Sequence, residues 1–235
     1  MKLFALCCFF LLSLSCEDTQ SSKNKPSESS TKTEAQKVIV EEKIPPKPER
    51  EFPLLTERNA MDFFLAYDKN NKENKVRITT DFGEIDILLF EKTKFHRSNF
   101  IFLTKQNYFD NTQFYRIVNN FIIQAGNSDQ KDVRKKRIEI GKYLLPPDTK
   151  RGYKHHRGVV SMPSSEIDNP HKLASPYEFF IVQNPSGAYH LDGDYTIFGR
   201  VTKGMDVVDE IAKQEADGRG WPNHNIYIRK VEILE

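Results

Sequence analysis

Residues 114–127 contain side-chain types that could hold a peptide backbone. Residues two apart in an extended chain share a face, so Phe114 and Arg116 lie on one side of a strand, as do Phe121 and Ile123 after an intervening turn. Arginine carries a permanent charge and a planar set of donors that can reach a carbonyl oxygen or an amide nitrogen. An arginine beside a phenylalanine therefore predicts an amphipathic slot suited to an X-Pro dipeptide. The alternative, which this segment alone favours, is an ordinary half-buried strand with a surface arginine.

The chemistry of such a slot would be bond rotation. Rotation about an X-Pro bond requires the loss of amide conjugation, and its barrier is about 18–20 kcal/mol. No covalent step is needed, because the nitrogen lone pair only has to localise as the bond twists. A donor held near that nitrogen stabilises the twisted form more than the planar one, and only such differential binding accelerates a reaction. Arg116 is the candidate donor.

The sequence F-Y-R-I-V-N-N-F-I-I-Q-A-G-N of residues 114–127 resembles the signature F-H-R-I-I-x-G-F-x-x-Q-G-G-D of cyclophilins, the peptidyl-prolyl cis-trans isomerases. Further blocks follow in the order that the family has them. Residues 157–162 resemble K-G-x-(L/V)-(S/A)-M, residues 178–181 resemble Q-F-F-I, residues 191–199 resemble L-D-G-x-(H/Y)-x-V-F-G, and residues 204–209 resemble G-M-D-V-V-D. Blocks that occur in order are far more specific than any one of them. The resemblance covers roughly residues 75–235.

The resemblance implies a role for each matching position. It places Arg116 at the position of the catalytic arginine. Phe121 and Phe180 would form the walls of a proline pocket, and Gln124 would hold the substrate backbone through its amide. The substrate-binding residues that the resemblance implies are Phe121, Ile122, Gln124, Met162, Glu178, Phe180, His190, Leu191 and Tyr195.

Several positions depart from the family's pattern. Glu178 replaces the usual glutamine, and an ionised carboxylate accepts hydrogen bonds but cannot donate them. It could pair with Arg116 and orient it, or draw it away from substrate. Tyr177 stands where the family prefers a small residue, and Pro163 has no backbone N–H to donate. His190 stands where many eukaryotic members have tryptophan, which should weaken cyclosporin binding more than catalysis.

Two functions of different classes therefore stay open. The first is an exported isomerase, EC 5.2.1.8, that assists the folding of envelope proteins. The second is a non-catalytic chaperone or scaffold that holds proline-containing peptides on a cyclophilin fold, and Glu178, Tyr177 and Pro163 favour it. A third reading, a structural envelope lipoprotein, leaves the matching site residues unexplained.

The composition argues against several other classes. The formal net charge of +2 is near neutral, whereas nucleic-acid-binding proteins usually present a strongly basic face. The one dense basic run is typical of a solvated loop, and it consists of Lys131, Arg134, Lys135, Lys136 and Arg137. The histidines are scattered and no cysteine follows Cys16, so metal-ligand spacing is absent. We expect no metal or organic cofactor, no nucleic-acid partner and a monomer.

The N-terminus is typical of a secretory signal. Residues 3–14 are mostly apolar, and this stretch is too short for the roughly 20 apolar residues that cross a bilayer. Residues 13–16 resemble a bacterial lipobox, whose cysteine is lipidated, although Ser13 stands where the usual pattern has leucine. We therefore expect a lipid anchor on Cys16 and a place in the cell envelope, in the periplasm or at the outer membrane. Cleavage of an ordinary signal near Ser15 is the alternative.

The chain is predicted to have four regions. Residues 1–15 form the signal peptide, and residues 16–50 form a flexible tether because they carry too little apolar area to offset their ordering entropy. Residues 51–74 form a helical extension, with an amphipathic helix over residues 54–68. The isomerase domain fills residues 75–235.

The last region is predicted to be mainly β. Two helices, at residues 93–107 and 205–213, and about eight antiparallel strands predict a closed barrel with helices capping its ends. The resemblance implies the same architecture, with a filled core and a groove on the outside. Phe179 and Ile123 are expected in the core. Residues 128–154 are predicted to be irregular, and Trp221 to anchor a loop.

Overall fold

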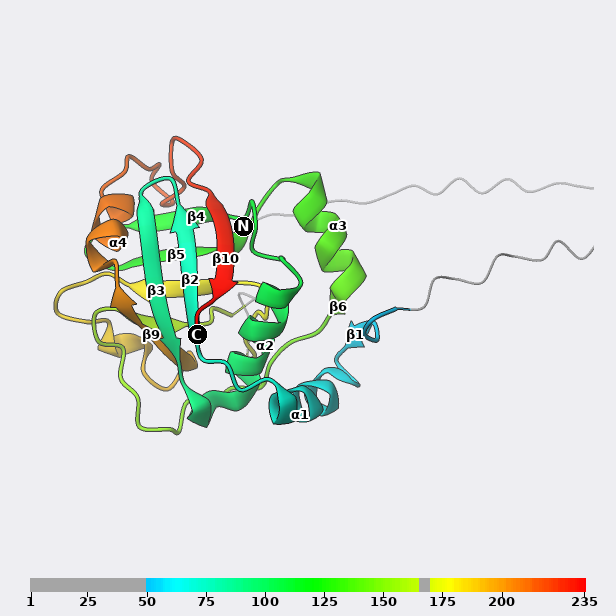
Figure 1. Cartoon of the computed structure of the whole chain (residues 1–235). Coiled ribbons are helices and arrows are strands. Elements are labelled where there is room, and N and C mark those ends of the chain that lie inside the picture. Colours follow the sequence, from blue (N-terminus) through cyan, green and yellow to red (C-terminus); the bar gives the residue numbers. More distant parts are fainter. Residues whose placement is uncertain (1–49, 165–169) are drawn as a thin grey trace, which may run out of the picture. The chain divides into compact units, whose positions relative to one another are not determined.

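The computed structural model describes residues 50–164 and 170–235, and the signal, tether and Cys16 predictions lie outside these residues (Figure 1). Eight strands pair in the order β10-β2-β3-β9-β7-β8-β5-β4, and every neighbouring pair is antiparallel. These strands are β2 (Lys75–Thr80), β3 (Gly83–Leu89), β4 (Gln113–Val118), β5 (Ile122–Asn127), β7 (Val159–Ser161), β8 (Phe179–Val182), β9 (Ile197–Lys203) and β10 (Ile228–Ile233).

The two edge strands of this sheet approach each other. Gln113 of β4 forms an isolated bridge with Tyr227, and the Phe114 amide donates to the Ile226 carbonyl over 2.9 Å. The Ile228 amide donates to the Thr112 carbonyl over 2.8 Å. These bonds nearly close the sheet, so the predicted eight-stranded antiparallel barrel is confirmed.

Alternate side chains along the strands point inward and fill the core of the barrel. In β2, Val76 and Ile78 are fully buried, whereas Arg77 between them faces outward. Arg77 donates two hydrogen bonds to Asp86 of β3, at 2.7 and 2.9 Å, which ties the outer faces of the two strands together. Phe179 and Ile123 are also fully buried, as expected.

Two helices cover the barrel as predicted. Helix α2 (Lys94–Lys105) buries Phe100, Ile101 and Leu103, and α4 (Met205–Ala212) buries Val208 and Ile211. Short 3-10 helices, η1 (Glu91–Thr93) and η2 (Tyr189–Leu191), connect other elements. Among the described helices, none is both long and apolar enough to pass through a bilayer.

The helix of the N-terminal extension begins later than predicted. Leu55 and Thr56 form a short strand, β1, that pairs in parallel with β6 (Gly141–Lys142), and α1 runs only from Ala60 to Asn70. The side chain of Asn59 accepts a hydrogen bond from the Thr56 amide over 2.7 Å, which closes the turn between β1 and α1. The prediction of helix from residue 54 was wrong because tertiary pairing takes Leu55 into a strand.

Helix α3 (Lys131–Ile140) lies within residues 128–154, which the sequence predicted to be irregular. Val133 and Ile140 are seven residues apart, which is two helical turns, and both are buried. These two contacts hold a helix whose other positions are largely charged and exposed. Gly141 then ends it at a φ of +135°, where an added Cβ would lie 1.9 Å from the Leu55 carbonyl oxygen.

The extension packs on α2 through aromatic rings. Phe63, Phe64 and Tyr67 of α1 lie 5.1, 5.8 and 5.5 Å from the ring of Phe102 of α2, all near edge-on. Figure 1 shows α1 beside α2, on the side of the barrel away from α4. Aromatic pairs of this geometry add about 0.5–1.5 kcal/mol each beyond area burial. The extension is therefore part of the folded domain.

Helix α2 also contains a buried histidine without partners. His96 is fully buried, and neither of its ring nitrogens has a hydrogen-bond partner within residues 50–164 and 170–235. Burial lowers the pKa of His96 from 6.5 to about 4, although the charge of Asp148 opposes this shift. Between these two pH values the unfolded chain binds this proton and the folded chain does not, so stability rises with pH.

We therefore expect the free energy of unfolding to fall by about 3 kcal/mol through His96 as the pH drops from about 7.5 to about 4. Urea titrations at several pH values measure this dependence. In His96→Leu this part of the pH dependence disappears, because leucine does not titrate. The exposed His224 is the matched control, and His224→Leu should keep the wild-type slope. Parallel pH profiles for His96→Leu and wild type would contradict the prediction.

Candidate functional site

Strand pairing brings three of the predicted site residues into one row. Arg116 of β4 lies opposite Gln124 of β5, and Gln124 lies opposite Phe180 of β8. Directly paired residues project from the same face of a sheet and are about 4.5–5.5 Å apart at Cα, so Arg116 and Phe180 are separated by about 10 Å. Their chain neighbours Ile117 and Phe179 are buried in the core. The row therefore faces outward.

A small apolar cluster forms the floor next to this row. It is separate from the barrel core, and its buried members are Ile122, Val159, Phe180, Val182, Ala188 and Ile197. Partly buried Phe121, Leu191 and Tyr195 pack against it. The Phe180 ring meets the Tyr195 ring edge-on at 5.7 Å. Five of the predicted substrate-binding residues thus lie together on the outside of the barrel, namely Phe121, Ile122, Phe180, Leu191 and Tyr195.

His190 and Met162 take different places. The ring of His190, which is exposed on η2, stacks on Phe121 at a centroid distance of 5.3 Å. Met162 is only 1% exposed and belongs to the main core, not to the cluster around Phe180. The structure therefore brings His190 to the rim of the floor and leaves Met162 beneath the surface.

The buried His155 packs against the ring of Phe180, and the sequence analysis did not single it out. The ring of His155 lies parallel to that of Phe180, at 6.0 Å and 12°. Its Nδ1 lies 2.8 Å from Asp192 Oδ1, and its Nε2 lies 3.2 Å from Ser161 Oγ. Burial lowers the pKa of His155, although Asp192 opposes this shift. His155 lies two residues before the block at residues 157–162, and this proximity was the available signal.

Arg116 is half-buried, and within the described ranges no carboxylate oxygen lies within 4 Å of it. The pairing with Glu178 that the sequence left open is not made. Burial raises the pKa of Glu178, and this shift is opposed by the charge of Arg137 and by hydrogen bonds with Tyr115 and Ser175. Glu178 thus faces a different arginine, and the guanidinium of Arg116 keeps its donors available.

Gln124 connects the row to Tyr115. Its amide Nε2 donates a hydrogen bond to the Tyr115 hydroxyl. A substrate carbonyl or amide that approaches Gln124 would meet a side chain that is already oriented. The side-chain amide of Gln124 keeps an acceptor oxygen and a second N–H for that contact.

Trp221 does not anchor its loop through burial, because its side chain is 48% exposed. The loop is held instead by its backbone. The Gly220 carbonyl accepts a hydrogen bond from the Ile117 amide over 2.8 Å, and Asp217 Oδ1 accepts from the Trp221 amide over 2.8 Å. The Trp221 ring lies 6.1 Å from Tyr115, close to the row.

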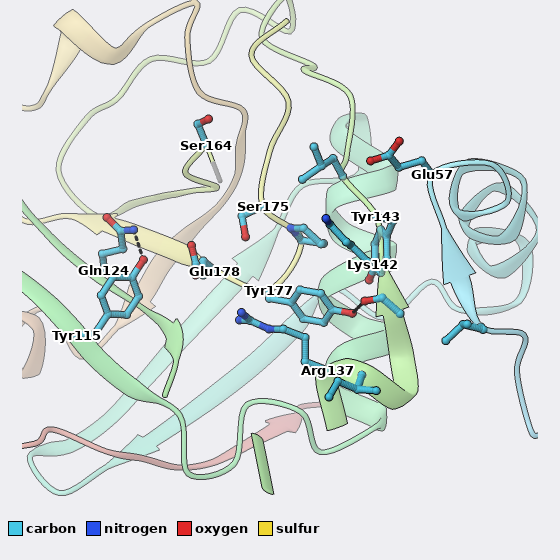
Figure 2. A pocket seen from close by; sticks show the side chains of 15 residues that line it. Glu57, Tyr115, Gln124, Arg137, Lys142, Tyr143, Ser164, Ser175, Tyr177 and Glu178 are labelled. Atoms are coloured by element: carbon cyan, nitrogen blue, oxygen red, sulfur yellow. Dashed lines mark hydrogen bonds between the residues drawn. The ribbon is translucent and has the colours of Figure 1, made fainter. Parts of the chain in front are cut away.

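A hollow of about 860 Å³ opens beside the row, and we call it the side pocket (Figure 2). Gln124 belongs to both the row and the side pocket. Other lining residues are Tyr115, Arg137, Ile138, Tyr177 and Glu178. The sequence analysis missed this pocket, because one of its walls comes from α3.

The chain belongs to the cyclophilin-type peptidyl-prolyl cis-trans isomerase family. The family described as "Cyclophilin type peptidyl-prolyl cis-trans isomerase/CLD" matches residues 75–233. A "Peptidyl-prolyl cis-trans isomerase-like 2" of Rhizopus delemar is 34% identical over 172 residues, which cover 72% of this chain and 31% of the relative. This chain thus spans about a third of that relative's length. A "Peptidyl-prolyl cis-trans isomerase" of Acinetobacter baylyi is 30% identical over 161 residues, 68% of this chain and 82% of the relative.

Solved structures agree with this assignment. The crystal structure of a cyclophilin type peptidyl-prolyl cis-trans isomerase from Cryptosporidium parvum matches with a TM-score of 0.58 and 26% identity, and the match covers 69% of this chain and 98% of that one. A second structure of that protein, in the presence of the dipeptide Ala-Pro, matches with a TM-score of 0.57 and 26% identity over 68% of this chain and 99% of that one. The family and the fold that the sequence blocks predicted are therefore confirmed.

Proposed function

We propose that this chain catalyses the cis-trans isomerisation of X-Pro bonds without a covalent intermediate. The observation that carries the proposal is the row of Arg116, Gln124 and Phe180 beside an apolar floor. A proline ring would lie on the floor around Phe180, and Gln124 would hold the backbone. Arg116 would then donate to the imide nitrogen as the bond twists, which lowers the barrier because the planar form offers that nitrogen no lone pair.

The substrates are proline-containing polypeptides. The family match supports this class, and so does the Cryptosporidium parvum relative, whose structure was determined in the presence of Ala-Pro. The row and the floor come from one chain, so the proposed enzyme acts as a monomer. No bound cofactor takes part in the proposed step.

The test is an isomerisation assay on the full chain with a short X-Pro peptide, read by NMR exchange or by a protease-coupled cis-to-trans rate. Peptide binding is measured separately through fluorescence of Trp221, the sole tryptophan, which lies 6.1 Å from Tyr115. A rate above the uncatalysed one supports the enzyme. Binding with no acceleration would instead indicate the non-catalytic peptide-binding protein.

We further propose that the enzyme is exported and held in the cell envelope by a lipid on Cys16. The proposal is supported by the apolar residues 3–14 and by the lipobox-like residues 13–16. It accounts for Cys16, the one cysteine that remains after cleavage of the predicted signal peptide, which would otherwise be a reactive thiol.

We expect Cys16→Ser to move the chain from the membrane fraction to the soluble fraction, because the acylated thiol is lost. Fractionation of cells followed by immunoblotting measures the distribution. Cys8→Ser, in the predicted signal peptide, is the matched control and should stay with the membrane. An unchanged distribution for Cys16→Ser would rule out the anchor.

A further inference from the structure

The side pocket extends the candidate site toward α3 and toward residues that precede the family match. Its wall near the row is formed by Tyr115, Gln124 and Glu178. Its opposite wall comes from α3 and from Leu54 and Glu57, which precede residue 75, where the family match begins. An extended peptide advances about 3.3 Å per residue, so a peptide with its proline on the floor can reach this pocket two to four residues away.

Arg137 is a fixed cation in this pocket. Its Nη2 and Nε donate to the Tyr108 hydroxyl over 2.8 and 3.3 Å, and its guanidinium carbon lies 4.7 Å from the centre of the Tyr177 ring. Tyr177 is itself held, because its hydroxyl donates to the Gly141 carbonyl over 2.6 Å. Figure 2 shows the guanidinium of Arg137 directed across the pocket toward the side where Glu178 and Tyr115 lie.

This guanidinium has no close counter-ion. Within residues 50–164 and 170–235, no carboxylate oxygen lies within 4 Å of Arg137. Glu178 is the acid on the facing wall, and its hydrogen bonds are with Tyr115 and Ser175 and not with Arg137. The other charged lining residues, Glu57 and Lys142, are exposed at the outer wall and largely balance each other. Among the described residues, Arg137 therefore makes no ion pair, and the one acid that faces it across the pocket is already hydrogen-bonded elsewhere.

We propose that Arg137 gives this chain a preference for proline peptides that carry an aspartate or glutamate two to four residues from the proline, with that carboxylate bound in the side pocket. This inference rests on the proposed function and deepens it. A planar guanidinium binds a carboxylate through two parallel hydrogen bonds, and such charge-assisted bonds are about twice as strong as neutral ones. The buried ring of Tyr177, over which the guanidinium lies, shields one side of such a pair from water and strengthens it.

The experiment compares matched peptides that differ only by glutamate or glutamine at one position, two, three or four residues to either side of the proline. The full chain is assayed for kcat/KM, and Kd is measured in parallel through Trp221 fluorescence. For at least one position we expect glutamate to be favoured about 10-fold or more in wild type. In Arg137→Gln the glutamate-to-glutamine ratio should fall to near 1.

Two further variants complete the test. Arg134→Gln removes the same charge from an exposed position of α3 outside the pocket, and it should keep the wild-type ratio. Arg137→Lys keeps a charge and an apolar stem but loses the planar fork, so its ratio should lie between those of wild type and Arg137→Gln. The Lys variant also provides a folded comparison if the Gln variant is unstable.

The outcomes separate this inference from the proposed function. If the peptides are isomerised but the glutamate-to-glutamine ratio is the same in wild type and both Arg137 variants, the charge preference is overturned. The proposed isomerase activity is still supported in that case. If glutamate peptides bind in an Arg137-dependent way but no peptide is isomerised, the preference stands and the isomerase does not. If the glutamate-to-glutamine ratio fell equally in Arg134→Gln and Arg137→Gln, the preference would come from the general positive charge of α3. That result would also overturn the role of Arg137.

Discussion

Replacing Arg116 with alanine should lower kcat/KM for an X-Pro peptide by a few hundredfold or more, while peptide affinity changes far less. Loss of one preorganised donor to a developing charge typically costs about 3–4 kcal/mol of transition-state stabilisation. Arg116 has no carboxylate oxygen within 4 Å in the described part of the chain, so its donors are not withdrawn in the free enzyme. The floor around Phe180 remains in the variant, and it supplies much of the ground-state binding.

The lysine variant distinguishes charge from geometry. Arg116→Lys keeps a positive charge but presents a compact ammonium on a flexible stem in place of the rigid fork. We expect it to recover little of the lost rate. The exposed Arg58, in the turn before α1, is the matched control for loss of an arginine, and Arg58→Ala should leave kcat/KM unchanged.

The same assays define the contrary result. Equal rates in wild type and Arg116→Ala, with peptide binding intact by Trp221 fluorescence, would remove Arg116 from the mechanism. Equal losses of rate and of affinity would mean that Arg116 binds the planar and twisted forms alike. Only a loss confined mainly to the rate agrees with a donor to the twisted imide.

Local sequence patterns account for only part of the strand alternation. The predictions that Phe114 shares a face with Arg116 and Phe121 with Ile123 were wrong, because the register shifts between Phe114 and Arg116 and because Phe121 precedes β5. Val76 and Ile78 alternate with Arg77, and this period-two pattern fixes which face of β2 enters the core. In β8 all four residues are apolar and buried, so alternation alone does not distinguish Phe179 in the core from Phe180 in the outer cluster. The row itself needed the family resemblance, because β4 and β8 are far apart in sequence and their register through Gln124 is a property of the folded sheet.

Helix α3 and the side pocket could not be predicted in this way. The helix has only two buried apolar residues among many charges, so its sequence resembles a solvated basic loop. Arg137 differs from Arg134 only in what surrounds it after folding, namely the rings of Tyr108 and Tyr177. No local pattern distinguishes these two arginines. The hydrogen bonds of Glu178 with Tyr115 and Ser175 were missed for the same reason.

The largest expected loss of stability follows from a buried ion pair between the extension and the barrel. Asp68 of α1 accepts hydrogen bonds from Arg97 and, over 3.1 Å, from Ser98 Oγ of α2. Lys72 lies 2.7 Å from the same carboxylate. The side chain of Arg97 is only 2% exposed, and its Nε has no hydrogen-bond partner among the described residues. Burial raises the pKa of Asp68, but the bonds from Lys72 and Arg97 lower it below its usual range.

Asp68→Ala should therefore lower the free energy of unfolding by about 3–5 kcal/mol, because it leaves the guanidinium of Arg97 buried and unpaired. Urea denaturation near neutral pH measures the loss. Asp62→Ala removes an exposed acid from the first turn of the same helix and should cost about 1 kcal/mol or less.

The double variant Asp68→Leu with Arg97→Met tests the cause of that loss. It removes both charges and keeps most of the volume, so it should recover a large part of the stability, because the cost of Asp68→Ala lies in the unpaired charge and not in a missing attraction. If Asp68→Ala is no more costly than Asp62→Ala, the contact between α1 and α2 does not depend on this pair. In that case other contacts, such as the aromatic rings around Phe102 and the pairing of β1 with β6, hold the extension on the barrel.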